Sequence, residues 1–144
     1  KSSMYHHFHA PCDATMADVT YISGDTWNVN PIALKTIERL YCKNERAIIN
    51  LRSTDANEEL TIVAVAAILV ASMRIRGIDV ALNLQYPGPK RISCERSLRR
   101  GDEIGYFEHG STLVMFAPPG CRIADGISVG DTVRMGQRLL LSHP

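Results

Sequence analysis

The sequence lacks a charge excess of either sign, a long apolar run and closely spaced cysteines. Its 16 Lys and Arg residues are balanced by 15 Asp and Glu residues, so no overall field draws the chain to nucleic acid. The longest apolar stretch, residues 60–73, is shorter than the roughly 20 residues that a transmembrane helix requires. These absences argue against a nucleic-acid-binding protein and against a membrane-spanning helix.

The four cysteines form no C-x-x-C pair and have no histidine at zinc-finger spacing, because they lie far apart at Cys12, Cys42, Cys94 and Cys121. We therefore expect no structural metal site. No leading apolar segment resembles a signal peptide. The sequence thus favours four reduced, mostly buried thiols and a cytoplasmic location.

The length of 144 residues and the hydrophobic content of 45% are enough for one domain with a sizeable core. We expect residues 1–144 to form a single domain. The chain enters an extended segment at residues 5–11 without a helix-start signal. This opening predicts that an upstream segment is missing.

Short apolar runs rich in Val and Ile predict strands, and frequent glycines between them predict sharp turns. Strands are expected at residues 16–22, 45–51, 60–75, 104–107, 112–116 and 139–141, and residues 60–75 could form one strand or two. Asn30 as N-cap and Pro31 in the first turn predict one short helix that runs through Leu40. Residues 100–104 and 129–133 share a Gly-Asp turn pattern that is similar to lipoyl and biotinyl domains. We therefore predict a mainly β (α+β) fold, a barrel-sandwich-like sheet with glycine-rich turns and one short helix.

Three histidines, His6, His7 and His9, crowd one extended segment. Neutral imidazoles can accept or donate protons near pH 7. In a regular strand His7 and His9 share a face while His6 points the other way, so joint use of His6 and His9 requires a bulge or a bend before Pro11. Without such a use they would be ordinary, partly exposed strand residues.

A Gly-Ser pair, Gly110 and Ser111, precedes the apolar run 113–116. Because Gly110 has no Cβ, its carbonyl can be approached closely, and the Ser111 hydroxyl can attack that carbonyl once a base removes the proton. The resulting ester can eliminate and hydrolyse, which breaks the backbone and leaves a pyruvoyl ketone at the new chain start. On composition alone, a plain turn is the commoner reason for such a pair.

Taken together, the motifs resemble the phosphatidylserine decarboxylases over essentially the whole chain. The matching segments are Tyr5-His6-His7-Phe8-His9-Ala10-Pro11, Asn44-Glu45-Arg46 and residues 100–112, which end in Glu108-His109-Gly110-Ser111-Thr112. In that family a Tyr-His-x-x-His motif and a Gly-Ser-Thr motif are diagnostic. Both are present here in the family's order.

The resemblance implies a pyruvoyl-dependent decarboxylase, a lyase of phospholipid biosynthesis that is made as a zymogen. Autocatalytic cleavage between Gly110 and Ser111 would give a β chain of residues 1–110 and an α chain of residues 111–144. The cofactor would be a covalent pyruvoyl group derived from Ser111. His9 would act with Ser111 and an upstream aspartate as a protease-like triad, and His6 would serve substrate and decarboxylation. The predicted catalytic residues are thus His6, His9 and Ser111.

One departure leaves the substrate open between two classes. The phosphatidylserine enzymes usually have Leu before Gly-Ser-Thr, whereas this chain has His109. Related members of the superfamily act on free amino acids, including aromatic ones, so a soluble amino-acid decarboxylase is the alternative. A third hypothesis is a non-enzymatic carrier-like β domain, although residues 133–135 lack the lysine that such domains carry at their turn.

Basic residues precede the Gly-Ser pair, in what we expect to be a loop, and could hold a phosphate head group or an anionic membrane surface. They are Lys90, Arg91, Arg96, Arg99 and Arg100. With the resemblance, they predict a phospholipid substrate and peripheral contact of a cytoplasmic protein with the membrane. The predicted partner of each self-cleaved chain is the other chain, and a homodimer is left open.

Overall fold

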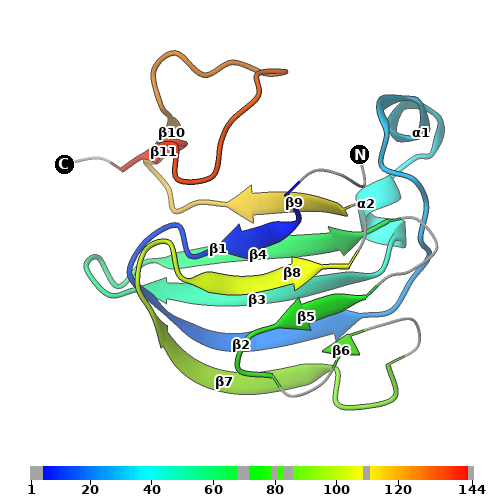
Figure 1. Cartoon of the computed structure of the whole chain (residues 1–144), viewed down its shortest axis with the longest axis horizontal. Coiled ribbons are helices and arrows are strands. Elements are labelled where there is room, and N and C mark those ends of the chain that lie inside the picture. The colour runs from blue at the N-terminus through cyan, green and yellow to red at the C-terminus, as the bar shows by residue number, and fades with distance from the viewer. Residues whose placement is uncertain (1–4, 68–71, 79–80, 83–85, 109–110, 143–144) are drawn as a thin grey trace.

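The protein is described by a computed structural model that covers residues 5–67, 72–78, 81–82, 86–108 and 111–142. Two antiparallel sheets lie one in front of the other, and a small hairpin follows at the C-terminal end (Figure 1). Strands make up most of the regular structure, as predicted. The sheets of the described residues do not close into a barrel.

The larger sheet has five strands in the order β7-β2-β3-β4-β9. Their bounds are Ala14–Ile22 for β2, Arg46–Ser53 for β3, Glu59–Ala66 for β4, Arg91–Leu98 for β7 and Ser111–Phe116 for β9. Buried and partly exposed residues alternate along β2 and β3, as expected when one face of a strand packs on a core. The buried face of this sheet lies against the second sheet.

The second sheet has four strands in the order β1-β8-β5-β6. Their bounds are His7–His9 for β1, Met73–Ile75 for β5, Ala81–Leu82 for β6 and Glu103–Phe107 for β8. The hairpin pairs β10, Arg122–Ile123, with β11, Leu140–Leu141. The region at residues 60–75, for which one strand or two were expected, contains two strands, β4 and β5, in different sheets.

Gly105 allows the first two strands of the second sheet to pack tightly. Phe8 lies opposite Gly105 in the ladder, and its ring covers this position in the core. A Cβ at Gly105 would lie 2.3 Å from the backbone oxygen of Arg74 and 2.8 Å from the Phe8 ring. Only glycine fits there, so this residue sets how closely β1 approaches β8.

The predicted helix begins as expected but is broken into two. The Asn30 side chain accepts a hydrogen bond from Ala33 N, and α1 spans Pro31–Thr36. The chain is extended at Ile37, and α2 follows at Leu40–Lys43. None of the α1 side chains is buried, so no packing supports a longer helix, and short helices are marginal without it.

Two further expectations are corrected. The basic segment that we took for a loop forms strand β7, whose exposed side chains alternate with partly buried ones along an edge of the sheet. The cysteines are not mostly buried, because they lie in loops, in α2 and on the edge strand: Cys42 is exposed, and the other three are partly buried. Within the described residues, no helix is long and apolar enough to cross a bilayer.

The two Gly-Asp phrases form the same kind of turn. Gly101 and Gly130 both have positive φ, at 89° and 97°. Asp102 accepts a hydrogen bond from Arg99 N at 2.9 Å, and Asp131 accepts one from Ser128 N at 2.7 Å. The two similar sequence segments therefore form similar turns, although the described sheets do not close into a barrel.

Candidate active site

The first strand, β1, carries its aromatic side chains on two faces. The Tyr5 ring stacks on His9 at a centroid distance of 5.8 Å and lies 5.2 Å from His7, so these three share the outer face. Phe8 is buried in the core. Because alternate residues of a strand point to opposite faces, His6 shares the core face with Phe8.

If His6 and His9 are to act at one site, β1 needs a bulge. A bulge is present, but it lies in the partner strand β8. Phe8 is opposite Gly105, whereas His9 is opposite Glu103, so β8 carries the extra residue. The alternation of β1 is therefore kept. The structure leaves His6 and His9 on opposite faces.

His9 is held by hydrogen bonds at both ring nitrogens. Its Nδ1 lies 2.8 Å from the Gly101 carbonyl, which can only accept, so Nδ1 carries the proton. Its Nε2 then accepts from the Tyr5 hydroxyl at 2.5 Å. The positive φ of Gly101 turns the chain so that its carbonyl reaches the ring. His9 thus has the tautomer of a general base, because its Nε2 carries a lone pair. The Gly101 carbonyl orients the ring, as an aspartate does in a catalytic triad.

His7 belongs to an ion-pair network on the outer face. Its Nδ1 lies 3.0 Å from Glu103, which also accepts from Arg76 Nε at 2.8 Å. Burial acts to raise the pKa of Glu103, but the hydrogen bonds from Arg76 and His7 hold this pKa below its usual value. The His7 ring also stacks on Tyr106. These contacts give His7 a structural role at the surface.

His6 differs from the other two because its Nε2 is buried without a hydrogen-bond partner. Its backbone carbonyl accepts from Phe107 N at 3.0 Å, at the end of β8. The chain passes from Phe107 towards the Gly-Ser pair. His6 is therefore tied to the segment that leads into the predicted cleavage site.

Strand β9 follows β8 along the chain but belongs to the larger sheet, whereas β8 belongs to the second sheet. Ser111 begins β9, and its backbone pairs with Ala66 at the end of β4. The predicted cleavage residue Gly110, like His109, lies outside the described residues. The β9 ladder with β4 continues to the pair Thr61 and Phe116, so β9 is fixed along its whole length.

Asn44 and Glu45 have no role predicted from their sequence pattern, although both are fully buried beside Ala66, the partner of Ser111. The Asn44 side chain donates to the Ala66 carbonyl at 2.9 Å and to the Trp27 carbonyl at 2.7 Å, and it accepts from Trp27 N at 3.1 Å. The Ala66 N–H donates to the Glu45 carbonyl at 2.9 Å. The two residues thus hold both backbone groups of Ala66.

Glu45 is the most perturbed acid of the described site. Its carboxyl is buried, and neither oxygen has a partner at standard hydrogen-bond geometry. Burial raises its pKa to about 7, against a smaller lowering by the Tyr21 hydroxyl. A polar Asn-Glu pair directly before the apolar run of β3 is the signal that could have marked it, because buried acids cluster at functional sites.

Two of the predicted phosphate-binding arginines bind protein groups instead. Arg91 donates to Asp18 at 2.9 Å, and Arg96 donates to the Arg76 carbonyl at 3.0 Å. Arg99 and Arg100 flank the turn before β8 and are exposed. Those two keep free guanidinium surface for an anion.

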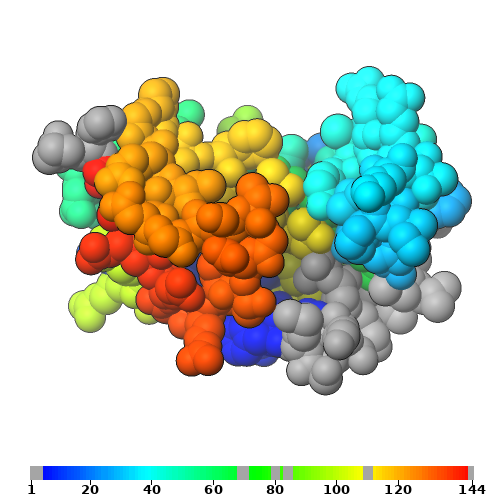
Figure 2. Space-filling view, turned by 90° about the horizontal axis from the view of Figure 1, so that it is seen from above, coloured from blue at the N-terminus to red at the C-terminus, as the bar shows by residue number. Residues whose placement is uncertain are grey.

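The strand that begins at Ser111 is accessible from one side of the molecule. Figure 2 shows β9 in a hollow between the C-terminal segment and the segment that carries α1 and α2. Leu113 is 44% exposed and Phe116 61% exposed. Two large apolar side chains of β9 are thus exposed, on opposite faces of the strand.

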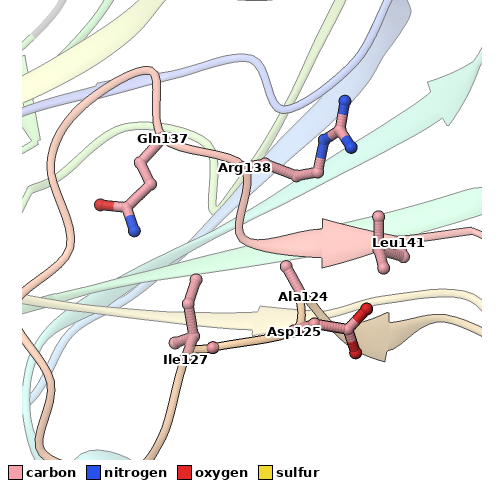
Figure 3. A pocket seen from close by; sticks show the side chains of 7 residues that line it. Ala124, Asp125, Ile127, Gln137, Arg138 and Leu141 are labelled. Atoms are coloured by element: carbon pink, nitrogen blue, oxygen red, sulfur yellow. The ribbon is translucent and has the colours of Figure 1, made fainter.

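A cavity of about 330 Å³ lies elsewhere, within the C-terminal segment (Figure 3). Its lining side chains include Asp125, Ile127, Gln137 and Arg138. None of the predicted site residues lines it, and the described residues hold no cluster of three potential metal ligands. This cavity is therefore separate from the candidate site.

Comparison with known proteins identifies relatives over nearly the whole chain. Residues 1–141 match the family model described as phosphatidylserine decarboxylase. The chain is 34% identical to a phosphatidylserine decarboxylase proenzyme of Shewanella frigidimarina, with 92% of this chain and 48% of that protein covered. Proenzymes of Haemophilus influenzae and Myxococcus xanthus are 34% and 31% identical, each with 94% of this chain and 48% of the relative covered. The chain spans about half the length of these relatives.

Proposed function

Because the chain belongs to the phosphatidylserine decarboxylase family, we propose that it is the catalytic part of a pyruvoyl-dependent carboxy-lyase. The proposed reaction converts phosphatidylserine to phosphatidylethanolamine and carbon dioxide, after self-cleavage between Gly110 and Ser111. One observation carries this proposal in the structure. The unpaired, buried Nε2 of His6 lies on a segment bound to the end of β8, from which the chain runs to Ser111.

The residues around Ser111 fit a small electrophilic group at the head of β9. The Nε2 of His6 and the carboxyl oxygens of Glu45 are buried polar atoms without a hydrogen-bond partner at standard geometry, although the Tyr21 hydroxyl lies close enough to lower the pKa of Glu45. When formed, the pyruvoyl ketone supplies an electrophile that takes up a substrate amine and accepts the electron pair released with carbon dioxide. The core face of β1 and the end of β4 that pairs with Ser111 would shield this group from water.

The two motif histidines are proposed to act in separate steps. His6 faces the core side of β1, so we assign it the proton that is delivered to the substrate carbon after carbon dioxide leaves. His9 is assigned the removal of the Ser111 proton, because its Nε2 lone pair is of the form that a base needs. For this step the hydrogen bond between His9 Nε2 and the Tyr5 hydroxyl must break.

The two products of cleavage are proposed to stay together as one enzyme. The α chain would keep β9, whose six residues are all paired with β4 of the β chain. Antiparallel pairing over this length, with Met115 packed against the core, does not depend on the peptide bond before Ser111. We also propose peripheral membrane contact at the cytoplasmic side, supported by the exposed apolar residues of β9 and the two exposed arginines.

Intact mass tests the proposed function. The wild-type chain is expected to give two fragments that divide after Gly110, and Ser111→Ala is expected to remain whole and inactive. Release of carbon dioxide from phosphatidylserine vesicles would then support the lipid substrate. Release from soluble amino acids but not from vesicles would favour the alternative substrate class. A wild-type chain that stays whole would refute both enzyme hypotheses.

A further inference from the structure

Among the described residues, two side chains have buried polar atoms without a hydrogen-bond partner: His6 at Nε2 and Glu45 at both carboxyl oxygens. Such atoms are rare in folded proteins, because each costs desolvation free energy that no partner offsets. The proposed proton transfer accounts for His6. Glu45 has no role in the reaction as described so far.

Glu45, Ala66 and Ser111 form one row across the larger sheet. The Ala66 N–H bonds to the Glu45 carbonyl, and Ala66 pairs with Ser111 on its other side. Neighbouring strands lie about 4.8 Å apart, so the backbones of Glu45 and Ser111 are separated by roughly 10 Å. The residue between them has only a methyl group. Cross-strand neighbours share one face of a sheet, so Glu45 and the head of β9 lie on the same face.

The surroundings of Glu45 favour its neutral form. Its side chain is fully buried, and Tyr21 of β2 is the titratable group of the described residues that faces it. Burial raises the pKa of Tyr21 to about 12, so the phenol remains neutral at ordinary pH. The described structure gives Glu45 no cation as a partner. A neutral carboxylic acid differs from a carboxylate because it can donate a hydrogen bond.

We propose that Glu45 donates a hydrogen bond, in its neutral form, to a carbonyl oxygen of the group that heads β9. On the ketone oxygen this hydrogen bond would stabilise the negative charge that develops as the substrate amine adds to the ketone, before that oxygen leaves as water. A neutral acid also spares the substrate carboxylate the repulsion that an ionised one would exert. This inference rests on the proposed pyruvoyl function and adds a residue to it.

The first test compares Glu45→Gln with Glu58→Gln in the self-cleaved enzyme. Glutamine keeps a donor but cannot ionise, and Glu58 is an exposed loop residue that loses the same charge. Wild-type decarboxylation is expected to fall by about tenfold per pH unit above a pH near 7, as Glu45 ionises. Glu45→Gln should lose this fall, and Glu58→Gln should keep it.

A second variant and a second readout separate this role from a structural one. Tyr21→Phe removes the neighbour that lowers the pKa of Glu45, so the alkaline fall should move to higher pH. Trapping of the ketone with a small amine and cyanoborohydride, followed by the mass of the tagged fragment, measures the group without turnover. The trapping rate should decline at alkaline pH in wild type and in Glu58→Gln, and not in Glu45→Gln.

The outcomes distinguish this inference from the proposed function. Wild-type protein that cleaves and decarboxylates, with a Glu45→Gln pH profile and trapping rate that superimpose on wild type, would overturn the role of Glu45 alone. A wild-type chain that neither cleaves nor traps an amine would overturn the proposed function, and the inference with it. An alkaline fall that Glu45→Gln abolishes and Tyr21→Phe shifts supports both.

Discussion

Replacement of the buried Glu45 by Gln should change how the stability of the fold depends on pH. The pKa of Glu45 is raised from 4.5 to about 7 in the folded protein. The folded state therefore binds the proton more tightly than the unfolded state, so wild type loses stability as the pH rises from about 4.5 to beyond 7. Glutamine does not ionise, so the variant should lack this loss.

The magnitude follows from the size of the shift. At about 1.36 kcal/mol per pKa unit, a shift from 4.5 to about 7 gives a ceiling on the order of 3 kcal/mol. Local relaxation and water penetration around the buried carboxyl reduce this ceiling, so we expect about 1–3 kcal/mol. For a domain of this size, each kcal/mol corresponds to a change of about 2–4 °C in Tm.

The assay is urea unfolding of wild type and Glu45→Gln between about pH 5 and pH 8, both in the Ser111→Ala background. That background keeps one chain, because unfolding of two separate fragments would depend on protein concentration. Any constant cost of burying the glutamine amide cancels when each protein is compared with itself across pH. A difference in unfolding free energy that stays flat over this range would refute the raised pKa, and with it the neutral acid.

Other substitutions test the remaining parts of the account. His9→Ala should slow fragment formation on denaturing gels by orders of magnitude, whereas His6→Ala should cleave and then fail to release carbon dioxide; normal cleavage in His9→Ala would disprove its role as base. Gly105→Ala should cost about 1–3 kcal/mol in urea unfolding, because the new Cβ meets the Phe8 ring and a backbone oxygen, and an unchanged midpoint would contradict that packing. Asn44→Asp should lower the free energy of unfolding by about 1–3 kcal/mol, because a carboxylate would face two backbone carbonyls that now receive hydrogen bonds. Unaltered stability near neutral pH would count against these hydrogen bonds.

Local patterns predicted the elements whose causes are local. The β-branched runs of β3 and β4 form strands, and Asn30 caps α1, because alternation and capping need only neighbours in the chain. The continuation to Leu40 failed for a non-local reason. A helix this short needs a surface to pack on, and α1 finds none.

The charged segment that forms β7 was wrongly predicted to be a loop. On an edge strand the outward positions tolerate charge, and Arg91 satisfies the buried Asp18 of the neighbouring strand. Strand order decides such a pairing. Nothing in the sequence near Arg91 reveals it.

The site was only partly predictable for the same reason. Alternation alone predicted that His6 and His9 face opposite sides, and the ring contacts agree. Glu45 was noted as part of a matching segment but given no role, because its position relative to Ser111 depends on a row that joins three separate strands. Only the order of β3, β4 and β9 places it beside the strand that Ser111 begins.

The mass of the C-terminal fragment tests the central claim most directly. If Ser111 becomes a pyruvoyl group, the fragment of residues 111–144 should be lighter, by the mass of ammonia, than one that begins with serine. Borohydride should then add hydrogen at the ketone. A fragment with the mass of a serine start, or a chain that is never cut, would contradict the account.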